Sequence, residues 1–232
     1  MQRFKTLLLV LLLPAIAMAQ EVQSPNGNVR LRFSLTGNGV PTYEMTYKNK
    51  AVVKPSHLGL ELAKDKHASK SMNETSLMDG FTIIDTKTSS FDETWRPVWG
   101  ETSTIRNNYT ELAVNLAQPA TKRNIIVRFR VYDYGMGLRY EFPQQDSLTY
   151  FVIKDEHTQF AMAGDHTAWW LPGDYDTQEQ KTQESRLSEI RSRFHDAVNW
   201  NNSSVAVFSP TGVQTALQMK TNDGLYLNIH EA

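Results

Sequence analysis

Apolar and polar side chains alternate along most of this chain, and this alternation restricts the possible folds more than any other feature. Successive side chains of a β-strand point to opposite faces, so alternation gives each strand one apolar face that can be buried. The alternating segments are residues 29–35, 43–47, 57–62, 81–84, 112–116, 125–132, 138–142, 150–153, 215–221 and 225–231. Short strands at this spacing predict an all-β fold, a mainly antiparallel sandwich of two packed sheets.

The same alternation predicts which side chains form the core and where the chain turns. The side chains expected to be buried are Leu31, Phe33, Leu60, Leu112, Val114, Leu116, Val127, Phe129 and Leu138. Residues 222–224 (NDG) predict a hairpin, because Gly224 can take a positive φ at no steric cost. Residues 135–137 (GMG) predict a turn that leads into the strand at 138–142.

Two segments depart from the alternation. Residues 184–198 carry apolar side chains at intervals of three and four, namely Leu187, Ile190, Phe194 and Val198. This spacing permits a short amphipathic helix, and a long loop between strands is the alternative. The polar stretch at residues 64–76 predicts a long surface loop.

The first 19 residues are typical of a signal peptide. A short basic region precedes an apolar run, and Ala17 and Ala19 form the small-residue pattern that signal peptidase recognises. We therefore expect export, cleavage after Ala19 and a mature chain of residues 20–232. A membrane anchor is the alternative, but the apolar run is too short to cross a bilayer, and no later run is long enough.

The charge and cysteine counts exclude some classes of function. The chain has 24 basic and 25 acidic residues and lacks a basic stripe, which argues against nucleic-acid binding. It has no cysteine, so an exported form must rely on its packed core for stability. Its six histidines lack the spacing of a zinc site, and we predict no metal role for any of them.

Residues 169–179 combine two tryptophans with three carboxylates, the side chains that a sugar site uses. Aromatic rings stack on sugar faces, and carboxylates accept hydroxyl protons or hold a cation. Alternatively, Trp169 or Trp170 is a core residue and the acids form a turn. A second aromatic and charged run, residues 91–101, could line a cleft, but Pro97 and the charges favour an edge segment of a sheet.

Several short sequence motifs together resemble the N-terminal domain of glycoside hydrolase family 97. They lie at residues 24–28, 41–43, 54–62, 93–101 and 139–143, and the most specific are 172–179 (PGDYDTQE) and 185–190 (SRLSEI). The resemblance covers essentially the whole chain after the signal peptide and is closest to the periplasmic, starch-utilising α-glucosidase branch. It implies an N-terminal β-super-sandwich, a catalytic (β/α)₈ barrel and a small C-terminal β-domain, of which only the first is expected here.

The resemblance also implies the chemistry. Members of this branch cleave α-glucosidic bonds of maltooligosaccharides from the chain end with inversion and a calcium ion, and the family also contains retaining α-galactosidases. The catalytic acid and base come from the barrel, so no catalytic residue is expected in this chain. One calcium ligand comes from the N-terminal domain and corresponds to Glu179, whereas Asp174 and Asp176 are expected to form a turn. Residues 180–184 depart from the family's pattern, which puts the local loop conformation in doubt.

Two functions of different classes remain as hypotheses. The chain is either a domain that completes a glycosidase site, inactive without its barrel, or a carbohydrate-binding module with no catalytic role. A binding module should carry exposed aromatic side chains in a row on one strand face. The glycosidase hypothesis is favoured, because the aromatic and acidic side chains gather in a loop punctuated by Gly and Pro. A purely structural adhesion domain is a third possibility.

Overall fold

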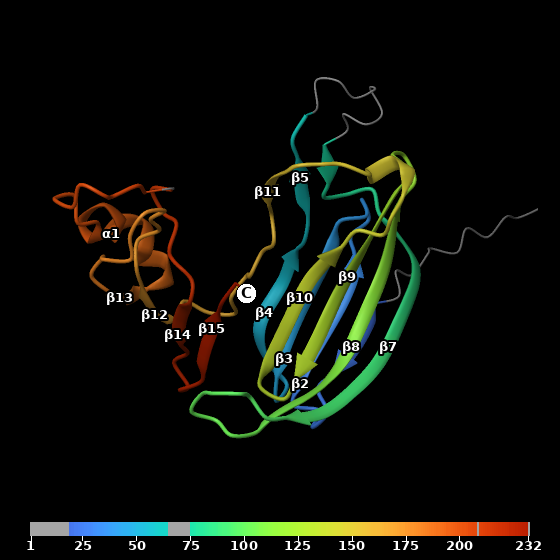
Figure 1. The fold of residues 1–232 in the computed structure, drawn as a ribbon, viewed down its shortest axis with the longest axis horizontal. Coiled ribbons are helices and arrows are strands. Elements are labelled where there is room, and N and C mark those ends of the chain that lie inside the picture. The colour runs from blue at the N-terminus through green and yellow to red at the C-terminus, as the bar shows by residue number, and fades with distance from the viewer. Residues whose placement is uncertain (1–18, 65–74, 208, 232) are drawn as a thin grey trace, which may run out of the picture. The chain divides into compact units, whose positions relative to one another are not determined.

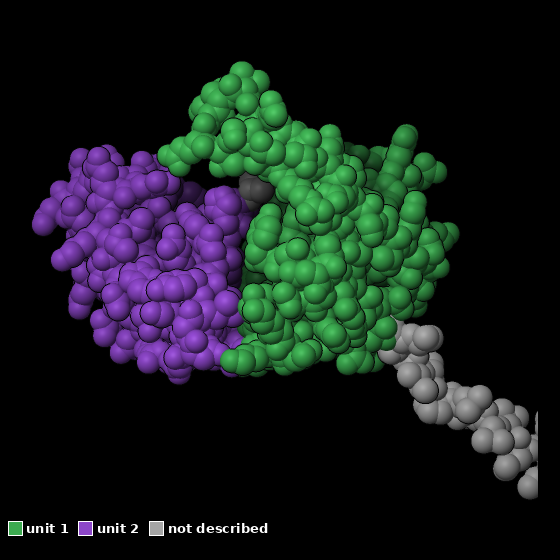
Figure 2. Space-filling model, turned by 90° about the horizontal axis from the view of Figure 1, so that it is seen from below, with its two compact units in different colours: residues 1–161 green, residues 162–232 purple. Residues whose placement is uncertain are grey.

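The computed structural model describes residues 19–64, 75–207 and 209–231, which form two compact units. Unit 1 is Met1–Ala161 and unit 2 is Met162–Ala232 (Figure 2). Strands predominate in both, and the described residues include a short α-helix, α1 (Ile190–Ala197), in unit 2 (Figure 1). None of the described helices has the length and apolar character that crossing a membrane requires. The predicted signal peptide lies outside the described residues apart from Ala19.

Unit 1 consists of antiparallel sheets. The first, in the order β1-β2-β3-β4, contains β1 (Gln20–Gln23), β2 (Val29–Leu35), β3 (Pro41–Tyr47) and β4 (Lys50–His57). The second, in the order β10-β9-β8-β7, contains β7 (Thr82–Trp95), β8 (Ile105–Gln118), β9 (Arg123–Tyr132) and β10 (Gly135–Glu141). A smaller sheet, in the order β11-β5-β6, contains β5 (Leu60–Leu62), β6 (Ser76–Leu77) and β11 (Ile153–Glu156), and a 3₁₀ turn, η1, spans Asp146–Leu148.

The first two sheets share an apolar core. On β2, Leu31 and Phe33 are fully buried between exposed arginines, as alternation requires. The ring of Phe129, on β9, lies 6.0 Å from that of Phe33 and 5.9 Å from that of Tyr43, measured between ring centroids. These contacts join the inner faces of the two sheets and confirm the predicted antiparallel β-sandwich.

Of the side chains predicted to be buried, all are buried except Leu138. Leu138 is only partly buried, and that prediction is wrong. Its strand, β10, is the edge of its sheet and has a neighbour on one side only. An edge position leaves part of the side chain open to solvent even when the alternation is correct.

Some predicted boundaries are also wrong. Residues 135–137 belong to β10, because the hairpin turns at Asp133 and Tyr134 instead. The strand expected at 150–153 begins only at Ile153, where pairing with the short β5 starts. The segment at 57–62 is interrupted, since β4 ends at His57 and β5 begins at Leu60. Of the loop predicted at 64–76, residues 65–74 lie outside the described residues.

Unit 2 packs a small antiparallel sheet against a helix. The sheet, in the order β13-β12-β14-β15, contains β12 (Thr167–Trp170), β13 (Gln183–Arg186), β14 (Leu217–Lys220) and β15 (Tyr226–Ile229). A 3₁₀ turn, η2 (Leu187–Glu189), leads into helix α1 (Ile190–Ala197). Trp170 stacks on Phe194 of α1, with ring centroids 6.4 Å apart and planes 9° from parallel.

The two alternatives for residues 184–198 are thus decided in favour of a helix, although only for residues 190–197. Ile190 and Phe194, one helical turn apart, face the core of unit 2 with Trp170 and Met219. The hairpin predicted at 222–224 is confirmed between β14 and β15, and Gly224 has a φ of 89°.

An ion-pair network on the outer face of the second sheet makes the stability of unit 1 depend on pH. Arg128 donates two hydrogen bonds of 2.7 Å to Glu141, and it also bonds Glu111. The hydrogen bonds from Arg128 and Arg139 to Glu141 outweigh the effect of burial and lower the pKa of Glu141 to about 2. Because the folded pKa lies below the usual Glu value, the stabilisation is present above about pH 4.5 and is lost as the pH falls towards 2.

We therefore expect unit 1 to lose about 1–3 kcal/mol of unfolding free energy through Glu141 between pH 5 and pH 2. Urea denaturation at several pH values measures this loss. In Glu141→Gln the dependence should become shallower, because the amide does not titrate. An unchanged slope in that variant would show that Glu141 is not the group responsible.

Candidate functional site

The loop of residues 171–182, which connects β12 to β13, contains the predicted calcium ligand and is held in place by Asp174. One oxygen of Asp174, Oδ1, accepts hydrogen bonds from the backbone N–H groups of Asp176 at 3.0 Å, Thr177 at 3.4 Å and Ala206 at 3.0 Å. Burial alone would raise the pKa of Asp174, but these donors outweigh it and place the pKa below its usual range. Asp174 is thus an ionised, turn-forming residue, as predicted.

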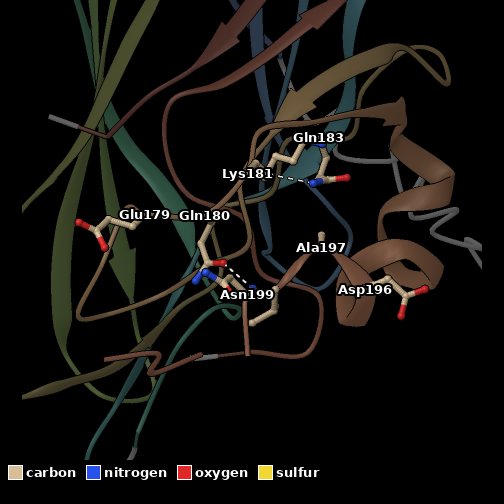
Figure 3. A pocket seen from close by; sticks show the side chains of 8 residues that line it. Glu179, Gln180, Lys181, Gln183, Asp196, Ala197 and Asn199 are labelled. Carbon is tan, nitrogen blue, oxygen red and sulfur yellow. Dashed lines mark hydrogen bonds between the residues drawn. The ribbon is translucent and has the colours of Figure 1, made fainter. Parts of the chain in front are cut away.

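A buried glutamine links the same loop to the end of helix α1. The Nε2 group of Gln180 donates to Asp174 Oδ2 at 2.9 Å, and Gln180 Oε1 accepts from the backbone N–H of Asn199 at 2.8 Å. Figure 3 shows the bond between Gln180 and Asn199. Because Gln180 uses both ends of its amide, it fixes the position of the residue that precedes it in the chain, Glu179.

Backbone hydrogen bonds fix the first half of the loop. The N–H of Gly173 donates to Gly212 at 2.7 Å, and the N–H of Tyr175 donates to Ala206 at 3.0 Å. Together with the bonds of Asp174 and Gln180, these contacts tie residues 173–180 to three separate parts of unit 2. The loop is therefore built as a rigid support.

Glu179 projects from this support into solvent. It is exposed, and its backbone N–H donates to Thr177 Oγ1 at 2.9 Å. Among the residues that the structure describes, none forms a hydrogen bond or ion pair with the carboxylate of Glu179. Glu179 borders an open depression of about 580 Å³, together with Gln180, Lys181 and the end of α1. Figure 3 shows its carboxylate pointing away from the Gln180–Asn199 bond.

The structure separates the two tryptophans of the 169–179 cluster. Trp170 is buried in the core of unit 2 and donates through Nε1 to Ser185 Oγ at 3.0 Å. Trp169 lies on the opposite face of β12, where it donates to Glu184 at 3.2 Å and stacks on Tyr226. One tryptophan is therefore a core residue, and neither is among the residues that line the depression beside Glu179.

The second aromatic and charged run, residues 91–101, begins in an edge strand of a sheet. Its first part, up to Trp95, belongs to β7, which is the edge strand of the second sheet. Val98 and Trp99 extend from the turn that follows and are almost fully exposed. The favoured interpretation, an edge segment, therefore agrees with the structure.

Sequence spacing missed one cluster of side chains with metal-binding chemistry. Glu61 on β5, Asp155 on β11 and His157 bring their ligand atoms within 4.8 Å of one another in unit 1. The glutamate is 94 or more positions before the other two residues, so no local motif reveals the cluster. Only the pairing of β5 with β11 brings these residues together.

Comparison with known proteins agrees with this arrangement of elements. The family model described as Glycosyl-hydrolase 97 N-terminal matches residues 22–232. A glycoside hydrolase family 97 enzyme from Pseudoalteromonas sp. strain K8, solved as a variant with panose and also with acarbose, matches with a TM-score of 0.72 and 29% identity. These matches cover 92% of this chain and 28% of that enzyme's chain.

A β-arabinopyranosidase structure is more distant, with a TM-score of 0.66 and 17% identity over 90% of this chain and 31% of that one. At this identity the likeness concerns the fold alone. The chain thus spans less than a third of the length of these solved relatives. On the match of the family model over nearly its whole length, the chain belongs to glycoside hydrolase family 97 and corresponds to the N-terminal region of its members.

Proposed function

We propose that this chain is the N-terminal domain of a calcium-dependent, exo-acting α-glucosidase that hydrolyses maltooligosaccharides. In this proposal the chain supports a catalytic barrel and contributes Glu179 as one calcium ligand. The observation that carries it is the contrast between Glu179 and its loop. The loop is fixed by buried hydrogen bonds, whereas the carboxylate is exposed and has no partner among the described residues.

The carboxylates of this loop can supply one ligand of a calcium site, from Glu179, and no more. Ca²⁺ takes about six to eight oxygen ligands at roughly 2.3–2.6 Å, and carboxylates are its usual charged ligands. Asp174 already accepts four hydrogen bonds, from three backbone N–H groups and Gln180, and cannot easily turn towards an ion. Glu179 would therefore complete a site whose other ligands come from the barrel. When bound, the ion would supply a Lewis acid that polarises or positions the substrate.

The relatives support the substrate class. The Pseudoalteromonas enzyme of the same family was solved with panose and with acarbose, both oligosaccharide ligands. An α-galactosidase of the same family is the alternative within the enzyme class. The proposal also includes export to the periplasm, which the signal-peptide pattern ending at Ala19 supports.

The structure gives little support to the alternative hypothesis of a carbohydrate-binding module. A row of aromatic rings does cross the outer face of the second sheet, formed by Phe91, Tyr109, Tyr132 and Tyr134 at centroid distances of 5.3, 5.3 and 5.8 Å. These rings contact one another, and Arg130 covers the buried Tyr109. Phe91 and Tyr134, at the two ends of the row, are exposed, but the middle of the row serves as cross-strand packing and offers no continuous platform for sugar stacking.

The test compares the complete protein with residues 20–232 alone. We expect the complete protein to release glucose from maltotriose, to lose this activity in EDTA and to recover it with Ca²⁺. Residues 20–232 should show no turnover, because an inverting glycosidase needs an acid and a base about 6.5–9.5 Å apart and both are expected in the barrel. Turnover by residues 20–232 would refute the domain assignment. Preference for a nitrophenyl α-galactoside over the α-glucoside would favour the alternative substrate.

A further inference from the structure

The small sheet of unit 1 carries a second group of metal-binding side chains, far along the chain from Glu179. Leu60 and Leu62 of β5 are buried, so alternation turns Glu61 outward between them. Asp155 on β11 is the direct cross-strand partner of Glu61. The backbone N–H of His157 donates to Gly59 at 2.9 Å, which continues the pairing by one residue beyond Glu156. His157 is two residues after Asp155 and therefore lies on the same face.

The distances between these side chains approach those of a metal site. His157 Nε2 lies 3.8 Å from Glu61 Oε2 and 3.8 Å from Asp155 Oδ2. Two ligands of a tetrahedral zinc ion, each about 2.0–2.1 Å from the metal, are about 3.3 Å apart. The two His157 distances therefore need to shorten by about half an ångström to reach ligand distance. The ligand atoms of Glu61 and Asp155 lie within 4.8 Å of each other, so that pair needs to close by no more than about 1.5 Å. Water would supply the fourth position.

We propose that Glu61, Asp155 and His157 form a surface site for a divalent transition-metal ion such as Zn²⁺. Two carboxylates and an imidazole are ligands that Zn²⁺ accepts, whereas a calcium site would be built from oxygen alone. The three residues of the transition-metal site lie in unit 1, whereas the calcium ligand proposed above, Glu179, lies in unit 2.

Lys154 is the natural competitor of the metal at this site. Its Nζ donates to Glu61 Oε1 at 2.6 Å, which leaves Oε2 on the side of His157. The hydrogen bond from Lys154 also holds the pKa of Glu61 below its usual range, so the carboxylate is ionised at neutral pH. The ammonium repels a divalent cation, and removal of its charge should strengthen metal binding. An ion-pair cluster without a metal role would not respond in this way.

The test is calorimetric titration of metal-stripped complete protein with ZnCl₂, with Ca²⁺ saturating throughout so that calcium sites are filled. His157→Gln should weaken Zn²⁺ binding by more than about tenfold, in line with the usual cost of disturbing a metal's ligands. Lys154→Gln should strengthen it by about threefold to tenfold at low salt. Co²⁺ in place of Zn²⁺ gives visible absorption that should vanish in His157→Gln.

His195→Gln is the matched control. His195 is more exposed than His157 and also lies beside a carboxylate, with 3.3 Å between Nδ1 and Asp196 Oδ1, but it has no second acidic partner among the described residues. This control should leave Zn²⁺ binding unchanged. The proposal is overturned if His157→Gln binds Zn²⁺ as the parent protein does, if His195→Gln weakens binding equally, or if Lys154→Gln weakens it. Far-UV circular dichroism checks that each variant keeps its fold.

Discussion

Replacement of Glu179 by Gln is expected to lower the calcium affinity of the complete protein by at least about tenfold and to remove most of its kcat. The amide keeps the size of the side chain but lacks its charge, and a hard cation loses a charged ligand. The fold of unit 2 should not change, because no described residue bonds the Glu179 carboxylate and the loop is held by Asp174 and Gln180. Calcium titration and glucose release from maltotriose measure the two losses.

Asp176→Asn provides the matched control for this prediction. Asp176 is an exposed acid of the same loop, three residues before Glu179, and its backbone N–H is already engaged by Asp174. Its substitution removes the same charge from the same surface, so a general electrostatic effect would appear in both variants. We expect less than a twofold change in calcium affinity. A Glu179→Gln protein with the parent kcat in the absence of added calcium would contradict the proposed role.

The sequence predicted the parts of the fold that depend on local alternation. Leu31 and Phe33 could be assigned to the core because every second residue of β2 is apolar. Strand β4 (Lys50–His57) was missed, since its lysines, Pro55 and His57 interrupt the alternation of apolar and polar residues. Its pairing with β3 also has an irregular register. Leu138 was wrongly assigned to the core, because its alternation is clear but alternation cannot show that a strand lies at the edge of a sheet.

The candidate site was predictable only in part, because its supports are not local. The position of Glu179 came from a motif resemblance, and the structure places this residue on a loop with its side chain exposed. The bonds that fix that loop join Asp174 to Ala206 and Gln180 to Asn199, across 32 and 19 residues. The departure from the family pattern at residues 180–184 did not prevent a defined loop, since Gln180 itself bonds both Asp174 and Asn199.

The largest effect on stability is expected from Phe129→Ala. Phe129 is fully buried, and its ring packs between Phe33 and Tyr43, so it contacts the inner face of the opposite sheet. Truncation removes buried apolar surface, leaves a cavity and breaks two aromatic contacts. Such changes cost about 3–5 kcal/mol, which is a large fraction of the stability of a typical domain. Urea denaturation of residues 20–232, followed by far-UV circular dichroism, measures the loss.

Leu138→Ala tests whether the cost of truncating an apolar side chain depends on where that side chain lies. Leu138 is the direct cross-strand partner of Phe129, on β10, but it is only partly buried at the sheet edge. A cavity cannot form where solvent already reaches the side chain, so we expect a loss of about 1 kcal/mol or less. Equal losses in the two variants would mean that the core does not lie between the two sheets at Phe129. A loss confined to Phe129→Ala would place the main stabilising contact of unit 1 at the interface of Phe33, Tyr43 and Phe129.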